Sequence, residues 1–464
     1  MKRLNNIKEQ LSINEYNKNT KIINNTLNKI AIISAVRTPF TNLQKGKFCN
    51  VPPDILLTDV ITELLQQGKV VEYKNNKNTS NQTMCNIIND KLNIQEIYIS
   101  NIDNPVSAFQ LTYACLGLAL GNKCLSVSVK TNSSLLAPNL QNINSCLFNL
   151  QIYSNRLCLV LGIDAYFNEY SYSDCIYNTI TSRNYLNDKI YNYNYQKKFV
   201  LNTNIFSQNI FNNKLSVNNL TPYGVSAEYY NKKHNIKKKD IDKYAENSVN
   251  NAINNKDNRY VIPIKINKMH INNTNKVQKI SEVISEDELN LKIKNKNINY
   301  SNSKKSYYIT GGTYTTENIG HLSIGSGGLC LINYKYAVNN KLKIISSIVS
   351  VEYGFDLINP EYSQAISIKN VLKINNLNVE DIDFFELNET FSGLVIITAN
   401  TLNIPLDKIN ITGGNIAYGD ALSVIDIRMI ISCINSLKKR GGKYGIVTST
   451  ITLKIGISVL IENE

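Results

Sequence analysis

The chain has 464 residues, long enough for two or three domains with substantial cores, and 43% of them are hydrophobic, as in globular proteins. Fifty basic and 36 acidic residues give a net charge of +14, but the lysines are scattered through low-complexity stretches such as residues 237–239, so we predict no nucleic-acid partner. No apolar run approaches the ~18 residues that a membrane span requires, and no span is expected.

Cysteine usage and the first residues indicate a compartment. The nine cysteines form no CxxC pair and most have apolar neighbours, which is typical of reduced, buried thiols. Residues 1–28 are polar and lack the apolar core of a secretory signal, so we interpret them as an N-terminal extension. We therefore predict a cytoplasmic location, with a mitochondrial one as the alternative. The sequence holds no clustered set of metal ligands, and no metal is expected.

Strands and helices alternate in the first half of the chain. An apolar strand is expected at residues 30–33. Residues 92–100 are expected to hold a helix end, a short acidic turn and a buried strand, and a helical segment follows. A further strand at residues 125–129 runs into a turn of small polar residues. The next helix leads to a strand at residues 157–162.

The second half of the chain repeats this order, which indicates an internal duplication. Strands are expected at residues 342–345, and at residues 409–411 before a glycine turn. Residues 377–385 are expected to hold a helix end, a short acidic turn and a buried strand, as residues 92–100 do. A long amphipathic helix and a strand at residues 445–450 complete the repeat. Such alternation predicts an α/β fold with two layers of mixed sheet.

The segments between these elements differ in composition. Residues 66–91, 166–218 and 265–307 are rich in Asn, Lys and Tyr, and we interpret them as surface insertions. Residues 219–263 are expected to be more ordered, with an amphipathic helix at residues 239–254.

Five short blocks of the sequence, in order along the chain, resemble those of the thiolases. The blocks are Ile33-Ser-Ala-Val-Arg-Thr-Pro-Phe40, Tyr223-Gly-Val-Ser-Ala-Glu228, Gly312-Thr-Tyr-Thr-Thr-Glu-Asn318, Glu386-Leu-Asn-Glu-Thr-Phe391 and Thr412-Gly-Gly-Asn-Ile-Ala-Tyr-Gly-Asp-Ala-Leu-Ser423. The resemblance implies duplicated thiolase-like halves in a layered αβαβα arrangement with a helical loop domain. The implied ranges are 29–165 with 308–336 for the first half, 166–307 for the loop domain and 337–464 for the second half.

Thiolases make or break a carbon–carbon bond next to a coenzyme A thioester, as acetyl-CoA acetyltransferases do. A thiolate carries the acyl group and a second thiol moves a proton on the α-carbon. A histidine, an asparagine-held water and backbone amides stabilise the oxyanions. The resemblance therefore implies coenzyme A or acyl-CoA as ligand, and a homodimer or higher homo-oligomer that pairs through the edge strand at residues 125–129.

The resemblance also assigns the catalytic positions, and most of them hold other residue types here. The nucleophilic cysteine falls on Asn132, the histidine on Asp420 and the second cysteine on Thr450, whereas the asparagine is retained as Asn388. A serine near the tail of the coenzyme falls on Gly320.

His321, beside Gly320, is the histidine nearest the expected ligand loop, and we take both as candidate ligand-binding residues.

These replacements bear directly on the chemistry. An amide cannot attack a thioester, a carboxylate repels an oxyanion, and a threonine hydroxyl is too weak an acid to replace a thiol. The sequence thus predicts a thiolase-like protein with impaired catalysis that persists in a binding role. Two alternatives stay open: altered acyl-CoA chemistry with Asp420 as base, and ordinary acetyl-CoA acetyltransferase activity.

Structural roles could also explain the same residues. Asn132 and Asp420 stand where a strand is expected to turn into a helix, and Asn and Asp stabilise helix N-termini by ~1 kcal/mol over Ala. Asn388 could cap a helix that begins near Thr390, and Thr450 suits a strand.

A further alternative is that a cysteine elsewhere in the chain supplies the catalytic thiol. Cys124 has neighbours that resemble those of the nucleophile, but it precedes the expected strand. Cys115 and Cys433 are expected in helices as core residues.

Overall fold

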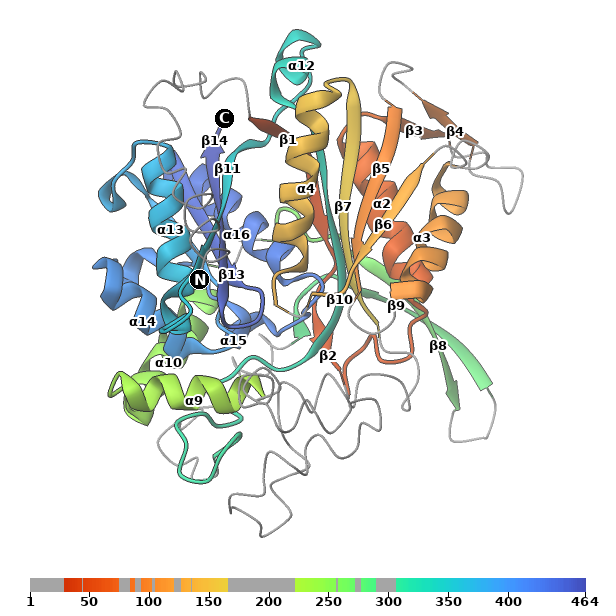
Figure 1. The fold of residues 1–464 in the computed structure, drawn as a ribbon. Coiled ribbons are helices and arrows are strands. Elements are labelled where there is room, and N and C mark those ends of the chain that lie inside the picture. The colour runs from red at the N-terminus through yellow and green to blue at the C-terminus, as the bar shows by residue number, and fades with distance from the viewer. Residues whose placement is uncertain are drawn as a thin grey trace, which may run out of the picture.

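The computed structural model describes residues 29–43, 45–74, 84–87, 93–101, 105–120, 127–134, 136–165, 222–255, 258–271, 277–288 and 306–464. The strands are β1 (Ile30–Arg37), β2 (Thr41–Asn42), β3 (Val71–Lys74), β4 (Met84–Ile87), β5 (Asn93–Ser100), β6 (Ser128–Asn132), β7 (Arg156–Asp164), β8 (Ile264–Ile271), β9 (Val277–Ile284), β10 (Ser323–Asn333), β11 (Ser346–Phe355), β12 (Phe384–Leu387), β13 (Tyr444–Thr450) and β14 (Ile455–Asn463). Ten of them form one mixed sheet in the order β12-β13-β14-β11-β1-β10-β7-β5-β6, with β2 paired to β10 (Figure 1).

The helices lie on and between these strands. They are α2 (Pro53–Gln67), α3 (Pro105–Leu120), α4 (Pro138–Ile152), α9 (Tyr223–Lys233), α10 (Lys238–Asn254), α12 (Tyr334–Asn339), α13 (Ser363–Ile374), α14 (Ser392–Leu402), α15 (Asn415–Tyr418) and α16 (Ile425–Arg440), with short 3-10 turns at Pro360–Tyr362, Val379–Asp381 and Leu406–Lys408. Among the helices described, none combines the length and apolar character that a membrane crossing requires.

The same series of strand pairings occurs twice. In the first half β1 pairs antiparallel with β10, β10 antiparallel with β7, and β7 parallel with β5, which pairs parallel with β6. In the second half β11, β14, β13 and β12 pair in the same order and the same directions. A single parallel bridge between Phe385 and Ile409 stands where the fifth strand would be. The pairing of β1 with β11 joins the two series into one sheet.

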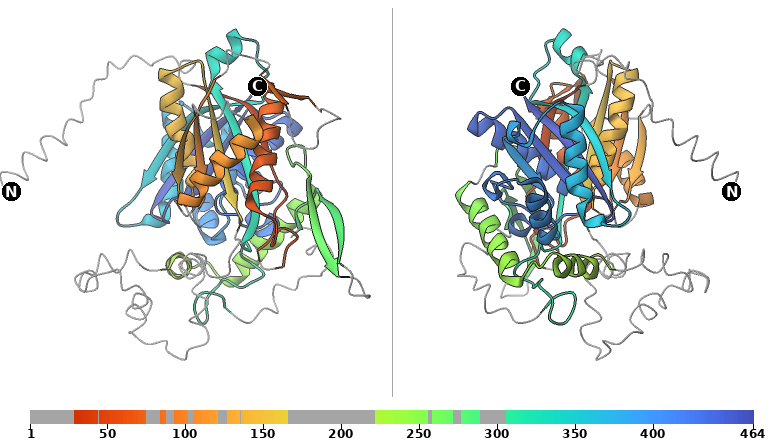
Figure 2. Two further views of the ribbon diagram at one scale, coloured as in Figure 1. Left: turned by 90° about the vertical axis from the view of Figure 1, so that its right-hand side faces the viewer. Right: turned by 60° about the vertical axis from the view of Figure 1, so that its left-hand side comes forward.

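Alternating side chains of the strands separate the core into layers. In β7, Leu157, Leu159 and Leu161 pack with α2 and α3, whereas Cys158 and Val160 pack with α4 and α16. This period of two is that of a strand buried on both faces. On the other side α13, α14 and α10 pack on β12 and β13. Helices α4 and α16 therefore lie between the two halves, and three helical layers alternate with two sheet layers (Figures 1 and 2).

Most of the expected elements are present, with shifted boundaries. The strand expected at residues 30–33 extends to Arg37, and the helix expected at residues 239–254 is α10, which begins at Lys238. The strand expected at residues 342–345 is wrong, because β11 begins only at Ser346. The strand expected at residues 409–411 is also wrong, since only Ile409 forms a bridge.

Two of the segments interpreted as insertions contain paired strands. β3 and β4 form an antiparallel hairpin within residues 66–91, and β8 and β9 form another within residues 264–284 (Figure 2). The third segment, residues 166–218, lies outside the described residues. Composition alone missed these hairpins because Asn and Lys at exposed strand positions do not interrupt backbone pairing.

A buried ion pair fastens the chain after β9 to the end of β1. The guanidinium of Arg37 donates to both carboxylate oxygens of Asp287, at 2.7 and 2.8 Å, and the Phe40 amide donates to the same carboxylate at 2.8 Å. Arg37 and Asp287 are 4% and 2% exposed, so removal of one partner leaves the other charge buried and alone.

We expect Asp287→Ala to lower the free energy of unfolding by about 3–5 kcal/mol, because it leaves the Arg37 charge uncompensated in the interior. Urea denaturation of the two proteins measures the difference. Glu282→Ala is the matched control, since its ion pair with Lys47 is partly exposed and should contribute less than about 1 kcal/mol. Equal effects of the two substitutions would contradict the buried role of Asp287.

Candidate functional site

Four chain segments bring the candidate residues together at one edge of the second half. Asn388 follows β12 and Thr450 ends β13, and these parallel strands finish side by side, with the Asn388 amide donating to the Thr448 carbonyl at 3.0 Å. Asp420 follows α15, and Gly320 and His321 precede β10. The carboxyl ends of neighbouring parallel strands are a common place for a site in α/β proteins.

Asp420 is buried and held in place by its backbone. Its amide donates to the His321 carbonyl at 2.7 Å, and its carbonyl accepts from the Ser323 amide at 3.1 Å. Oδ2 lies 2.7 Å from Oγ1 of Thr390, whereas Oδ1 has no hydrogen-bond partner within the described part of the chain. Burial raises the pKa of Asp420 to about 6.

Asn388 connects Asp420 to the first half of the chain. Its Oδ1 accepts from the Thr390 amide at 2.8 Å and from Nδ2 of Asn415 at 3.0 Å. Its Nδ2 donates to Oγ of Ser449 at 2.9 Å, and the Ser449 hydroxyl donates to the Leu136 carbonyl at 2.7 Å. We call Asn388, Thr390, Asn415 and Asp420 the Asp420 network.

The contacts of Thr390 favour a proton on Asp420. Oγ1 of Thr390 lies 2.7 Å from Oδ1 of Asn388 and 2.7 Å from Oδ2 of Asp420. A hydroxyl has one proton and the amide oxygen of Asn388 has none, so only one of these contacts can use the Thr390 proton. A protonated Asp420 supplies the second, donating to Thr390 while Thr390 donates to Asn388. The raised pKa of Asp420 agrees with this arrangement.

Two further carboxylates hold the loop after Asp420 against the first half. Asp164, at the end of β7, accepts from the Ser423 amide at 2.7 Å and from its hydroxyl at 2.6 Å. Asp426, in the first turn of α16, accepts from the amides of Asn139 and Leu140 at 3.0 and 3.2 Å. These are amides of the first turn of α4, which Asp426 therefore caps. Burial raises the pKa of both aspartates to about 7.

Two glutamates near the network differ in their partners. Glu389 accepts hydrogen bonds from Tyr244, Ser248, Asn410 and the Ile416 amide. Both carboxyl oxygens of Glu386 are buried without a partner among the described residues, and burial raises the pKa of Glu386 to about 8. The hydrogen bonds of Glu389 are thus satisfied within the protein, whereas burial favours the neutral form of Glu386.

Asn132 does not take part in the Asp420 network. It is the last residue of β6, its Nδ2 donates to the Pro138 carbonyl at 3.1 Å, and its Oδ1 accepts from the Ser134 amide at 2.9 Å. The carbonyl of Leu136 reaches the network instead. The expectation that Asn132 caps α4 is wrong, because Ala137 is the residue at the N-cap.

The capping roles expected for Asp420 and Asn388 are wrong as well. α16 begins at Ile425 with Val424 at its N-cap, since the loop after Asp420 first crosses the interior. α14 begins at Ser392 with Phe391 at its N-cap. Thr450 is the last residue of β13, as its β-branched side chain suggested, and it is 4% exposed.

The two candidate ligand-binding residues adjoin Asp420. A methyl group at Gly320 would lie 3.2 Å from Cβ of Asn415 and 3.3 Å from Cβ of Asp420, so this turn packs directly on the network. His321 is exposed, and its carbonyl accepts the Asp420 amide. Thr390 and Asn415 were missed in the sequence, although Thr390 lies inside the block around Asn388 that resembles the family.

Five of the described thiols lie in the core: those of Cys115, Cys146, Cys158, Cys330 and Cys433. Cys115 and Cys433 are buried in α3 and α16, as expected, and burial raises the pKa of Cys115 to about 11. Within the described part of the chain, no cysteine shares a hydrogen bond with the Asp420 network, and no group of three potential metal ligands is found. Cys124 lies outside the described residues.

Comparison with known proteins agrees with this architecture. Residues 342–463 match the family model described as the thiolase C-terminal domain. The C-terminal part of the chain, residues 342–463, therefore belongs to the thiolase family, and the chain as a whole has the thiolase fold. Its fold is close to that of the dimeric peroxisomal thiolase of Saccharomyces cerevisiae, with a TM-score of 0.70 at 19% identity over 94% of this chain and 98% of that one. Human mitochondrial 3-ketoacyl-CoA thiolase in complex with CoA gives a TM-score of 0.68 at 18% identity over 95% and 99%.

Curated relatives of this chain align over shorter stretches. Acetyl-CoA acetyltransferase IA of Candida tropicalis is 27% identical over 231 residues, which are 48% of this chain and 54% of the relative. Peroxisomal 3-ketoacyl-CoA thiolase B of Rattus norvegicus is 31% identical over 164 residues, 34% and 38% of the two chains. The chain thus spans between a third and just over half of the length of the curated relatives that it matches.

We expect the free energy of unfolding to fall as the pH rises from about 5 to about 8. The folded protein raises the pKa of Glu386, Asp164 and Asp426 above their unfolded values, so it binds more protons than the unfolded chain in this range. Glu386→Gln should remove on the order of 3 kcal/mol of this dependence, because the Gln side chain does not ionise. Urea denaturation at the two pH values measures it.

Glu389→Gln is the matched control. Glu389 accepts four hydrogen bonds, so the amide should destabilise the protein at both pH values by a similar amount. A Glu386→Gln protein that keeps the full pH dependence would show that Glu386 is not neutral in the folded state.

Proposed function

We propose that this protein binds coenzyme A or an acyl-CoA on a thiolase scaffold without performing the thiol-based cleavage or condensation of the family. The observation that supports the proposal is the Asp420 network. At the position where the resemblance expects an imidazole, a buried carboxyl group is engaged with Thr390 inside the protein. Asn388 and Thr450 lie at the ends of adjacent strands in the same region.

The groups that are present cannot easily replace those of the family reaction. The reaction needs a thiolate to take up the acyl group, and Thr450 offers a hydroxyl, while Asn132 lies outside the network and offers an amide. Loss of one oxyanion donor alone costs roughly 10²–10³ in rate. Replacement of the nucleophile, the imidazole and the second thiol together should remove ordinary turnover.

Binding of coenzyme A has separate support. Relatives are named as acetyl-CoA acetyltransferases and 3-ketoacyl-CoA thiolases, and one of the similar structures is a complex with CoA. Gly320 and His321, which the resemblance assigns to the ligand loop, adjoin Asp420. The net charge of +14 attracts phosphate-bearing ligands. A cytoplasmic location remains our proposal, and the reduced, buried thiols support it.

A second candidate function rests on the pKa of Asp420. A carboxyl group with a pKa of about 6 is close to the range of an effective general base near neutral pH. Its Oδ1 has no partner in the described part of the chain and could accept a proton from the α-carbon of a bound acyl thioester. This reaction would need no thiol.

An assay with acetoacetyl-CoA and free CoA separates these functions. We expect no loss of the thioester enolate absorbance, together with a CoA-dependent rise in the melting temperature, because ligand that binds only the folded state stabilises it. Turnover that iodoacetamide abolishes would contradict the proposal and indicate a reactive thiol. Turnover that resists iodoacetamide but is lost in Asp420→Asn would favour the second candidate. A melting temperature that does not respond to CoA would exclude the binding role.

The edge strand β6 supports a homodimer of this chain. It is the last strand of the ten-stranded sheet, and Ser128, Lys130 and Thr131 are exposed. Exposed apolar side chains of the flanking helices accompany it: Phe109, Leu118, Phe148 and Ile152. An unpaired edge with apolar flanks suits pairing with a second copy, and the similar yeast thiolase is dimeric.

We expect Thr131→Lys to convert the dimer to monomers. When β6 pairs with its copy across a two-fold axis, the two new lysines lie close together, and their like charges repel each other. Light scattering after size-exclusion chromatography measures the mass. Asn339→Lys, at an exposed position at the end of α12, is the control and should leave the dimer intact. A monomeric wild-type protein would contradict the proposed assembly.

A further inference from the structure

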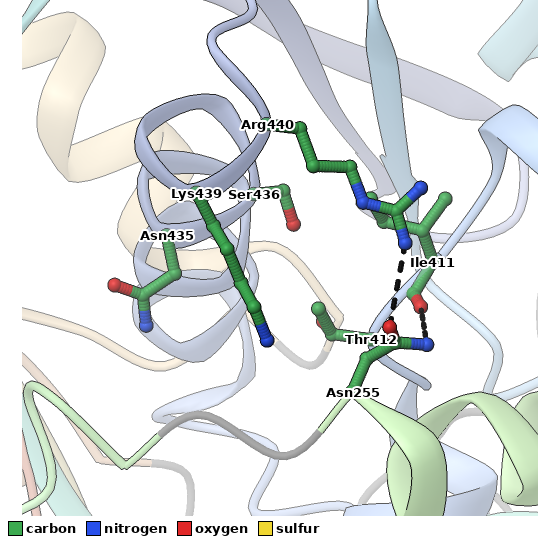
Figure 3. A pocket seen from close by; sticks show the side chains of 7 residues that line it. All are labelled: Asn255, Ile411, Thr412, Asn435, Ser436, Lys439 and Arg440. Carbon is green, nitrogen blue, oxygen red and sulfur yellow. Dashed lines mark hydrogen bonds between the residues drawn. The ribbon is translucent and has the colours of Figure 1, made fainter.

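A small pocket lies at the opposite end of α16 from Asp420. It is bounded by the residue after α10, by the segment before α15 and by the last turns of α16 (Figure 3). Its empty volume is about 220 Å³, part of it open to solvent. The lining residues are Asn255, Ile411, Thr412, Asn435, Ser436, Lys439 and Arg440. The lining residues of α16 begin ten residues after Ile425, so about 15 Å of helix separates the pocket from the start of α16.

Polar atoms in the lining are buried without a partner. Oγ1 of Thr412, Oδ1 of Asn435 and Oγ of Ser436 have no hydrogen bond within the described part of the chain. These residues are 7%, 4% and 2% exposed. Folded proteins rarely leave such atoms unpaired, so a group from outside the chain is indicated. In Figure 3 Ser436 and Lys439 extend from α16 toward the side on which Thr412 and Asn255 lie.

Positive charge at the mouth of the pocket is not balanced by an acid. Lys439 and Arg440 are exposed, and no ion pair of either is found among the described residues; Nη2 of Arg440 donates to Oδ1 of Asn255 at 3.4 Å. No acidic residue belongs to the lining. The surroundings are basic too, because burial and then Lys343 and Arg259 lower the pKa of Lys438.

We propose that this pocket binds a small oxyanion, either free phosphate or the phosphate group of a larger ligand. The hydroxyls of Thr412 and Ser436 donate to its oxygens, and Lys439 and Arg440 balance its charge.

Neither the helix dipole nor a bound water molecule alone accounts for both the unpaired hydroxyls and the two cations. Basic residues in the last turn of a helix interact favourably with its dipole, which accounts for Lys439 and Arg440 but not for the unpaired hydroxyls. A water molecule could pair with the hydroxyls but would not offset the charge. The C-terminal end of a helix repels an anion, so the two cations are needed for binding there.

The test is titration of the full chain with inorganic phosphate at constant ionic strength, with chloride as the reference anion. We expect phosphate to raise the melting temperature and to bind measurably by isothermal titration calorimetry. Ser436→Ala should weaken phosphate binding by about tenfold, and Lys439→Gln should weaken it and reduce its salt dependence. Lys373→Gln, in the last turn of α13, is the matched control and should bind phosphate as the wild type does.

The phosphate-free protein provides a second readout. Without ligand, Ser436→Ala should keep or raise the melting temperature, since it removes an unpaired buried hydroxyl. A lower melting temperature of Ser436→Ala in phosphate-free buffer, together with no effect of phosphate on the wild type, would mean that the pocket holds water only and would overturn the proposal.

The source of the phosphate is decided by competition. CoA that displaces inorganic phosphate, and whose own binding Ser436→Ala weakens, would assign the pocket to a phosphate of that ligand. Phosphate binding that CoA leaves unchanged would assign it to the free anion. Failure of CoA binding with phosphate binding intact would contradict the proposed function and leave this inference standing.

Discussion

The buried N-terminal ends of two interior helices must find hydrogen-bond partners within the protein, and much of the structure follows from that constraint. α4 and α16 lie between strands of both halves, where water does not replace missing hydrogen bonds. α4 has Ala137 at its N-cap and therefore no side-chain cap of its own. Asp426 of α16 supplies the acceptor for its first amides, so the start of one central helix is fixed to the other.

The candidate site is built under the same constraint. The loop from Asp420 to Val424 crosses the interior before α16 begins, and its polar groups are paired across the two halves, as Ser423 is with Asp164. An acid in such a place keeps its proton to higher pH, and the short contacts of Thr390 fit a neutral Asp420. At the imidazole position the scaffold therefore holds an acid that loses its proton near pH 6.

The sequence predicted those parts of the fold that depend on local apolar patterns. β13 was expected within a residue of where it lies, because its continuous apolar residues mark a buried strand. The strand expected at residues 342–345 failed since pairing with β1 and β14 begins only at Ser346, and pairing across the sheet leaves no local signal. The duplication in the sequence did reflect two series of identical pairings.

For the site, the sequence predicted which strand ends matter but not how their side chains pair. Asn388 and Asp420 converge because β12 and β13 are parallel neighbours and the glycine turn returns the chain to their ends. Asn132 does not converge, because β6 continues to that residue and its side chain turns to the start of α4. Thr390 and Asn415 were missed because they meet Asp420 only through folding, which residue spacing does not encode.

The buried unpaired atoms at the two ends of α16 differ in whether they can change their charge. Near its beginning the unpaired atoms include acid oxygens of Asp420 and Asp426, beside Nε of Arg428, and an acid can remove its burial cost by taking up a proton. Near its end the unpaired atoms of Thr412 and Ser436 are hydroxyl oxygens, which cannot change charge, so only a ligand or water can satisfy them. The helix between them is tightly packed: a methyl group at Gly445 would lie 2.2 Å from Sγ of Cys433. Sliding of α16 against β13 is therefore costly, and the two ends of the helix are held at a fixed distance.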